Sequence, residues 1–314
     1  MGQVLVLGLI SGGIYALFAL GVVMVHRGTG VLTFANGEVG TAGLFLAALL
    51  VDGWTIPVPF IDNPTLPALP WALGALAAVA FAALLGCLFE VLVVRRMGVS
   101  DPVAVAVATV GLALFLLASE LQIFGESPKE LAAPVTGGPT IFGVIVTPTQ
   151  IAGLLLAIAL GFGLQAVLRR TDFGLGILAA AQDPAAVRLV GVPLSRISLT
   201  IWGAGAALAA IAALLVEPTV GILYPGYASE LYVVGLAAAV IGGLNSLPGA
   251  VVGGCVLGIA QSAATRYLSD LHLPGLHFVV VLVVLLVVML GRQLLPELIK
   301  RMDTAPSRAA EVSA

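Results

Sequence analysis

Apolar residues form nine runs along the chain, and short segments richer in charged residues and Pro separate them. Most of the runs are long enough for an α-helix to cross about 30 Å of hydrocarbon. The second and seventh runs are short for a complete crossing. We therefore expect an all-α fold, a polytopic transmembrane helix bundle of about eight or nine spans, with broken or short helices in each half. The predicted spans end near residues 25, 51, 94, 124, 168, 216, 241, 267 and 295.

Composition supports a membrane protein and narrows its partners. Hydrophobic residues make up 60% of the 314 residues and charged residues 9%, and the mean hydropathy is +1.16. A chain with so few polar side chains cannot cover a water-soluble core, so we expect membrane lipid around it. The net charge is −3 and the 13 Lys and Arg residues are dispersed, which argues against a nucleic-acid surface.

The cysteines and histidines give no pattern of a metal, redox or catalytic site. Cys87 and Cys255 lie inside apolar runs, where we expect small inert thiols. The three histidines have no ligand-like spacing with each other or with Cys. We therefore expect no metal, no cofactor and no enzyme activity.

A polar segment, residues 169–196, separates the fifth and sixth apolar runs. Within it, Asp183 can cap a helix, Pro184 fits the first helical position, and Gly191 can end the helix. A helix of about two turns is marginal in water by itself. Because Val187 and its apolar neighbours have no core to join, we expect this helix to dock onto another protein. The alternative is an ordinary polar connector that happens to be helical.

Three segments resemble those of one transporter family. Residues 179–192, AAAQDPAAVRLVGV, resemble the cytoplasmic coupling loop of ABC importer permeases, and more narrowly that of the branched-chain amino acid permease family. Residues 33–40, TFANGEVG, resemble the family's Asn-Phe-Ala-His-Gly-Glu segment, with Thr and Asn where the family often has Asn and His. Residues 242–254, GGLNSLPGAVVGG, resemble its Gly-Gly-x-Gly-Ser-x-x-Gly-Ala segment, with Asn245 in place of a Gly.

The resemblance implies a permease subunit that works with other proteins. In the family such a subunit pairs with a second related permease, with cytoplasmic ABC ATPase subunits and with an extracellular or periplasmic substrate-binding protein. The implied substrates are leucine, isoleucine, valine or a related small amino acid or amide. The chain has no Walker A motif, so the energy must come from a separate ATPase. The implied ATPase-coupling residues are Gln182, Asp183, Pro184, Arg188 and Gly191.

Polar residues in the second apolar run point to a site inside the membrane. Such a break in a membrane helix is tolerated only where protein or a watery cavity surrounds it. We therefore interpret Glu38 as a pathway or gating residue; the alternative is a helix N-terminal charge in the headgroup layer. The Gly-rich segment 242–254 is expected to face this break across a transport pathway. The candidate pathway or gating residues are Asn36, Gly37, Glu38, Gly243, Asn245, Ser246 and Gly249.

Basic residues concentrate on alternate connections, which predicts an orientation. Arg27, the pair at 95–96, the arginines of segment 169–196 and the pair at 300–301 alternate with connections rich in Asp and Glu. By the positive-inside rule, we expect an extracytoplasmic N-terminus, nine crossings and a cytoplasmic C-terminus in a bacterial cell (inner) membrane. The first run has no basic residue before it and no cleavage site, so we expect a retained helix.

The chain divides into a transmembrane permease domain, residues 1–296, and a cytoplasmic C-terminal tail, residues 297–314. Residues 125–150 are expected to form an external loop with a small hairpin within 140–147, a surface that would suit an extracellular binding protein. Glu90 lies one turn before two arginines and should pair with them. Thr109 opens a short Thr-Val-Gly-Leu signature of the family, although Thr and Gly in a membrane helix usually indicate packing.

Two other classes of function remain open at this point. An ion-coupled secondary transporter or channel would need intramembrane acids, for which the candidates are Glu38, Glu90, Glu120 and Glu217. An intramembrane enzyme would need Ser246 as nucleophile with His272 or His277 as base. Both histidines fall in a loop predicted at the opposite face, which argues against the enzyme.

Overall fold

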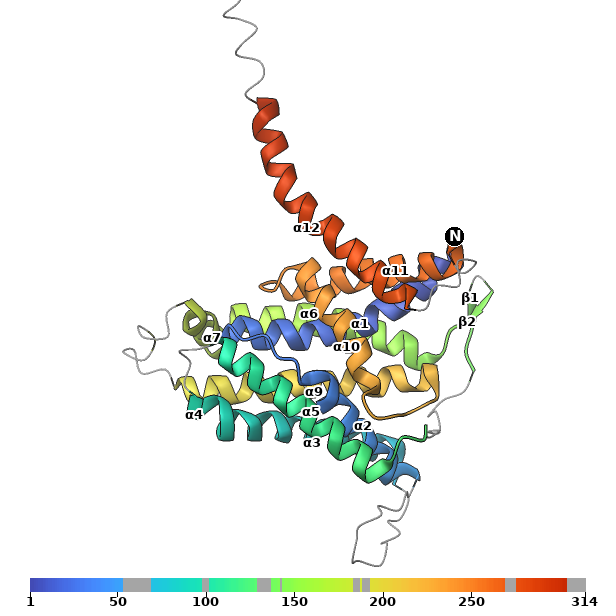
Figure 1. Cartoon of the computed structure of the whole chain (residues 1–314), viewed down its shortest axis with the longest axis vertical. Helices are drawn as coiled ribbons and strands as arrows, with labels where there is room; N and C mark the ends of the chain where they lie inside the picture. The colour runs from blue at the N-terminus through green and yellow to red at the C-terminus, as the bar shows by residue number, and fades with distance from the viewer. Residues whose placement is uncertain are drawn as a thin grey trace, which may run out of the picture.

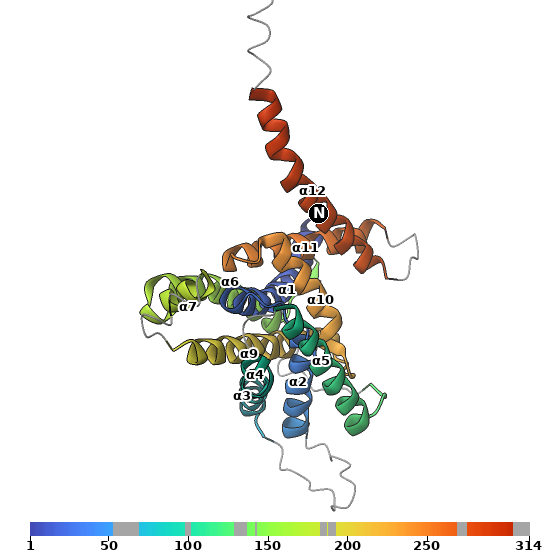
Figure 2. The ribbon, with the colours of Figure 1, turned by 60° about the vertical axis from the view of Figure 1, so that its left-hand side comes forward.

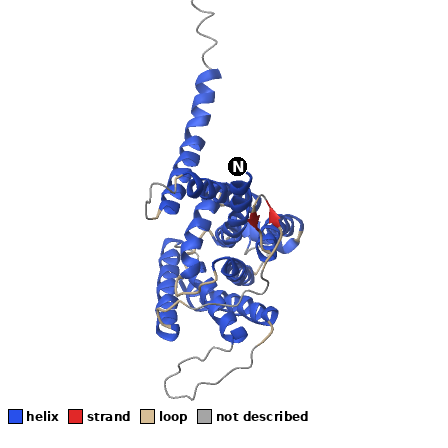
Figure 3. Ribbon diagram, turned by 90° about the vertical axis from the view of Figure 1, so that its right-hand side faces the viewer, coloured by secondary structure: helices blue, strands red, loops and turns tan. Residues whose placement is uncertain are grey.

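The protein is a helical bundle in the computed structural model, which describes residues 1–52, 69–97, 102–128, 137–141, 143–182, 187, 193–268 and 275–303. Figure 3 shows helices throughout and one small pair of strands. The helices are α1 Gly2–Thr29, α2 Asn36–Asp52, α3 Trp71–Phe89, the π-helix η1 Glu90–Val94, α4 Arg95–Met97, α5 Pro102–Phe124, α6 Pro148–Arg170, α7 Asp172–Gln182, α9 Leu194–Val220, α10 Tyr227–Gly242, α11 Leu247–Tyr267 and α12 Leu276–Asp303.

Each of the nine predicted apolar spans coincides with a helix. Six helical segments in the described chain are long and apolar enough to cross a membrane: α1, α5, α6, α9, α11 and the continuous stretch from α3 to α4. The apolar helix α10, the apolar part of α12 and the 17-residue α2 are shorter. The predicted polytopic all-α bundle, with short helices in each half, is therefore confirmed.

Helix α1 lies at the centre of the bundle, packed against α6, α9, α10 and α11 (Figure 1). Most of its second half, from Ala16 to Val25, is inaccessible to solvent. Helices α5 and α6 instead expose large apolar side chains, as lipid-facing helices do. Helix α12 extends away from the other helices in both Figure 1 and Figure 2.

Two local predictions are confirmed. Strands β1 Thr140–Ile141 and β2 Val144–Ile145 pair antiparallel as the expected small hairpin. Helix α6 begins directly after it with a capping box, in which Thr147 and Gln150 satisfy each other's backbone N–H groups. In η1, the buried Glu90 accepts a hydrogen bond from Arg95 Nη2 at 2.9 Å, so the acid has the local partner that its spacing suggested.

The helix pairs α1–α2 and α9–α10 have the same local pattern, and the two pairs run in opposite directions through the bundle. Gly30 caps the C-terminus of α1 and Gly221 that of α9, and both glycines have positive φ, 72° and 69°. A short non-helical segment follows each long helix and leads into a short helix, α2 or α10. A methyl group at Gly28, near the end of α1, would touch Ile201 near the start of α9, so the two long helices are antiparallel. The two return segments therefore enter the bundle from opposite ends.

Candidate functional site

The two short helices start next to each other inside the bundle. Ser229 Oγ, in the first turn of α10, donates a hydrogen bond of 2.7 Å to Glu38 Oε1, in the first turn of α2. The backbone N–H of Ala228 donates to Thr41 Oγ1 at 3.1 Å. Gly226 N, at the N-cap of α10, donates to Glu120 Oε2 at 3.3 Å. Side chains of α2 and α5 thus satisfy N–H groups that the start of α10 leaves free.

This junction lies at the middle depth of the bundle. A methyl group at Gly40 would touch the carbonyl of Ala209, near the midpoint of α9. Glu38 is 4% exposed, as is Glu120. The alternative position for Glu38, in the headgroup layer, does not agree with this depth.

Glu38 and Glu120 form a buried pair of carboxyl groups. Each uses one carboxyl oxygen at the start of α10, and Glu38 Oε2 and Glu120 Oε1 have no hydrogen-bond partner in the described part of the chain. Neither acid forms an ion pair with a described Lys or Arg. Both carboxyl groups thus lie at the N-terminus of α10, where the helix dipole favours negative charge.

Side chains from other helices satisfy the return segment before α2. The Tyr232 hydroxyl donates a hydrogen bond to the carbonyl oxygen of Thr33, and Phe34 N donates to Thr109 Oγ1 at 2.9 Å. Non-helical backbone at this depth needs such partners because lipid offers none. Thr109 therefore does more than pack: its hydroxyl supports the backbone of the segment that carries Asn36.

The candidate residues Asn36 and Gly37 belong to the same junction. Asn36 is 4% exposed, and its Nδ2 has no hydrogen-bond partner in the described structure. A side chain at Gly37 would collide with the backbone of Ser229, so only a glycine allows α2 and α10 to approach this closely.

The second group of candidate residues forms a separate turn at the other end of α10. Gly243 ends α10 with φ 92°, and Ser246 caps α11 by accepting a hydrogen bond from Gly249 N at 3.1 Å. Asn245 lies in the turn between the two helices. Because α10 is 16 residues long, about 24 Å separates its two ends. The expected pairing across a pathway, between 36–40 and 242–254, is therefore not formed; the partner of Glu38 is the start of α10.

The structure also separates Ser246 from His277, the nucleophile and base that the enzyme hypothesis requires. Ser246 precedes α11, whereas His277 lies beside Gln261, 15 residues further along that helix, so about 22 Å separates the two side chains. The hydroxyl of Ser246 has a capping role, and a base at that distance cannot activate it. His272 lies outside the described residues.

Arginines collect at one end of the bundle. Arg27 Nη1 donates to Gln165 Oε1 at 2.7 Å and lies close to Arg169, while Arg95 Nη2 donates to the carbonyl oxygen of Ser195 at 3.4 Å. This contact brings the start of α9 beside α4. The predicted grouping of these basic connections on one side of the membrane agrees with this arrangement.

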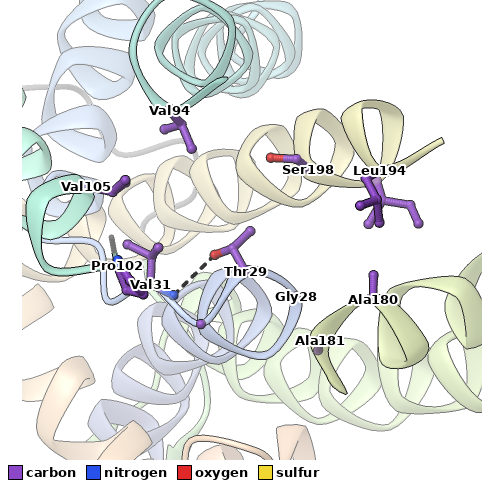
Figure 4. A pocket seen from close by; sticks show the side chains of 12 residues that line it. Gly28, Thr29, Val31, Val94, Pro102, Val105, Ala180, Ala181, Leu194 and Ser198 are labelled. Atoms are coloured by element: carbon purple, nitrogen blue, oxygen red, sulfur yellow. Dashed lines mark hydrogen bonds between the residues drawn. The ribbon is translucent and has the colours of Figure 1, made fainter. Parts of the chain in front are cut away.

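A cavity of about 130 Å³ opens at this end (Figure 4). It lies between the end of α1, the start of α5, the last turn of α7 and the start of α9. Ala180 and Leu194, which flank residues 183–191 in the chain, both line it, and apolar side chains such as Val105 form much of its wall (Figure 4). A cavity bounded by helix ends leaves room for those ends to move relative to one another.

Most of the predicted coupling helix lies outside the described residues. This applies to Asp183, Pro184, Arg188 and Gly191, whereas Gln182 is the exposed last residue of α7. Val187 is described and is 8% exposed. It belongs to neither described hydrophobic cluster, and Leu189 and Val190 lie outside the described residues, so docking of this helix onto another protein stays a prediction.

Comparison with known proteins identifies the family. The family model described as "Branched-chain amino acid transport system / permease component" matches residues 4–290, which is nearly the whole chain. The chain belongs to this permease family. It is therefore a multi-pass membrane protein of a transport family and not a member of an enzyme family.

Curated relatives of the permease have related names. It is 29% identical over 292 residues to the high-affinity branched-chain amino acid transport system permease protein BraD of Pseudomonas aeruginosa, covering 90% of this chain and 92% of BraD. It is 28% identical over 291 residues, with the same coverage, to the permease protein LivH of Escherichia coli K12. It is also similar to the autoinducer 2 import system permease protein LsrC of an Enterobacter species, at 28% identity over 76% of this chain and 63% of LsrC. No solved structure matches the permease.

Sequence reasoning missed half of the junction in the permease. Thr41, Ser229 and Tyr232 were not singled out, although their hydroxyls make the contacts between α2, the return segment and α10. A signal was present: Gly30-Val31-Leu32 and Gly221-Ile222-Leu223 are similar tripeptides, and a Glu follows several residues after each of them.

Proposed function

We propose that the permease is the transmembrane subunit of an ABC importer that moves branched-chain or related small amino acids into the cell. The observation that carries the proposal is the family match over residues 4–290, together with relatives named as branched-chain amino acid permeases. A bundle without a nucleotide-binding motif needs separate ATPase subunits. A second related permease and an extracellular or periplasmic substrate-binding protein complete the proposed complex.

The proposed coupling element is the helix at 183–191, preceded by Gln182. Its support is its position in the chain between α7 and α9, whose residues Ala180 and Leu194 line the cavity at the arginine-rich end of the bundle. ATP-driven closure of the ATPase pair would move this helix, and α6 and α9 would transmit the movement. The basic residues at this end favour a cytoplasmic location for it and an extracytoplasmic N-terminus, in a bacterial inner membrane.

The junction at Glu38 is the proposed gate. Its support is the meeting of two helix starts at mid-depth, held by the hydrogen bonds of Ser229 and Thr41. Hydrogen-bonded helix ends can separate without breaking a continuous helix, so opening the junction changes few contacts. Asn36 and Gly37 belong to this proposed gate, while the turn at Gly243, Asn245, Ser246 and Gly249 would transmit movement from α10 to α11.

The test is uptake of radiolabelled leucine by vesicles that contain the permease with its co-purified partners. We expect uptake to require ATP and to be lost in Arg188→Glu and in Gly191→Trp, while both variants still insert in the membrane. Arg308→Glu, the same charge reversal in the predicted cytoplasmic tail, serves as the control and should transport normally.

Normal uptake by the two coupling variants would refute the coupling role. Uptake driven by a proton or sodium gradient without ATP would support the alternative of an ion-coupled secondary transporter. Mass spectrometry of proteins that co-purify in mild detergent identifies the partners directly.

A further inference from the structure

A groove lined by several polar side chains lies along α1 and α11. It has a volume of about 540 Å³ and lies between α1, α11 and the first turn of α12. Its described lining from α1 includes Gln3, Ser11 and Tyr15, which recur at multiples of four residues and so share one helix face. The polar lining from α11 and α12 is Gln261, Ser262, Thr265, Arg266 and His277.

The groove reaches far below the headgroup layer. From Gln3 to Tyr15 the rise along α1 is about 18 Å, more than half of a hydrocarbon layer of about 30 Å. Side chains at the mouth could contact lipid headgroups, but hydroxyl and amide groups at the depth of Ser11 and Tyr15 could not. Polar groups at that depth need protein, water or a polar ligand beside them.

The rest of α11 shows what a lipid-facing surface of this helix looks like. An adjoining groove between α11 and α12 is lined by Ala263, Tyr267, Val283 and other predominantly apolar residues. Ser262 and Ala263 are neighbours in the chain and both half-buried, yet they line different grooves. The polarity is therefore confined to one side of the helix.

The chemistry of the groove matches a zwitterion with an apolar side chain. Arg266 is exposed at the mouth, and the described lining contains no carboxylate, so the groove attracts an anionic group. Gln261 uses its Nε2 to donate to the carbonyl oxygen of His277, which leaves its Oε1 to accept from an ammonium group. Val4 and Leu7 provide apolar wall.

We propose that this groove is one wall of the substrate pathway, in which Arg266 receives the carboxylate of the amino acid and a second permease subunit supplies the opposite wall. The inference rests on the proposed function, since that function supplies the substrate class and the second subunit. It places the substrate on the outer side of the α1–α11 pair. The junction at Glu38 then acts from within the bundle, through α1 and α10, which pack against each other.

The first experiment measures water access and does not depend on the substrate. In the assembled transporter with Cys87→Ala and Cys255→Ala as background, Ser262→Cys and Ala263→Cys are exposed to a membrane-impermeant thiol reagent. We expect position 262 to react at least tenfold faster than position 263. Equal rates would overturn the assignment of the groove to an aqueous pathway.

The second experiment measures leucine uptake with saturating binding protein and ATP. We expect Arg266→Gln to lower the maximal rate at least tenfold, and Arg266→Lys to restore a substantial part of it because it keeps the positive charge. Tyr267→Phe, the adjacent residue in the apolar groove, is the matched control and should transport normally. Unchanged uptake by Arg266→Gln would overturn the role of Arg266.

Two further outcomes distinguish a pathway role of Arg266 from a lipid contact, and failure of the groove proposal from failure of the proposed function. A defect of Arg266→Gln seen in vesicles with phosphatidylglycerol but absent in neutral-lipid vesicles would assign Arg266 to a lipid headgroup and overturn its role. If the wild-type complex moves no leucine while position 262 still reacts quickly, the proposed function fails and the aqueous groove stands.

Discussion

At the scale of single residues, the interior of the permease is held by side chains that bond to backbone of other helices. Thr41, Thr109, Glu120 and Tyr232 each satisfy a backbone group of a segment that enters the bundle without being helical or that starts a helix there. An unpaired N–H or C=O inside a membrane protein costs more than the net value of one hydrogen bond. These four residues therefore fix where α2 and α10 begin.

We expect Thr41→Val to destabilise the permease by about 1–3 kcal/mol, because it removes the acceptor of the Ala228 N–H without changing side-chain volume much. Thr41→Ser keeps the hydroxyl and should be close to the wild type. Ser119→Ala, which removes an exposed hydroxyl bonded within its own helix, should change stability by less than about 0.5 kcal/mol. Thermal unfolding in detergent compares the variants, and wild-type stability of Thr41→Val would contradict the role given to Thr41.

At the scale of elements, the contact between α10 and α11 depends on glycine. A methyl group at Gly253 would overlap the carbonyl oxygen of Ala238 and lie 2.9 Å from Gly242 N. Backbones of neighbouring membrane helices come this close only where side chains are absent. Gly111 in α5 is different, because a methyl group there would meet nothing within 4 Å.

The two glycines should respond to the same substitution with opposite sign. Gly253→Ala forces α10 and α11 apart and should cost about 1–3 kcal/mol. Gly111→Ala removes the conformational freedom of a helical glycine and should stabilise α5 by up to about 1 kcal/mol. Thermal unfolding of the two purified variants measures both effects; a loss of stability in Gly111→Ala, or none in Gly253→Ala, would contradict this account of the packing.

At the scale of the whole molecule, two inverted units, α1–α2 and α9–α10, meet at the centre. Because their long helices are antiparallel, the short helices start from return segments that enter from opposite ends. The arginine-rich end and the end with the β1–β2 hairpin are the two ends of this arrangement (Figure 1).

The positive-inside rule predicts which end faces the cytoplasm. In the Cys87→Ala, Cys255→Ala background, Thr140→Cys in the hairpin should react with an impermeant thiol reagent in cells whose outer membrane, if present, has been made permeable. Thr171→Cys, between α6 and α7, should react only after the inner membrane is also made permeable. The reverse pattern would invert the proposed orientation and place the coupling segment outside the cell.

Much of the architecture could be predicted from the sequence because lipid imposes a simple requirement. A segment that crosses hydrocarbon must be apolar and helical, so each apolar run could be assigned to a helix. Local rules also sufficed for the Glu90–Arg95 pair and for the small hairpin, since both depend on near neighbours in the chain. The family segments around Glu38 and Gly243 were visible as polar or Gly-rich breaks.

The sequence did not predict which segments of the chain contact those polar or Gly-rich breaks. Glu38 was expected to oppose the Gly-rich turn, but it bonds to Ser229, which is 191 positions away in the chain. Which breaks meet depends on how antiparallel helices align in depth, and hydropathy carries no information about that alignment.

The sequence by itself determined that this chain is a helical membrane protein, because its apolar runs have the length of a bilayer and its few charges cannot cover a soluble core. It also determined the family, since the family model matches residues 4–290 and relatives named branched-chain amino acid permeases are 27–29% identical to the chain. Only the tertiary structure decided that α2 and α10 start beside each other and that polar residues of α1 and α11 share a groove. Those features arise from contacts between distant segments, where backbone groups without water must find partners in other helices.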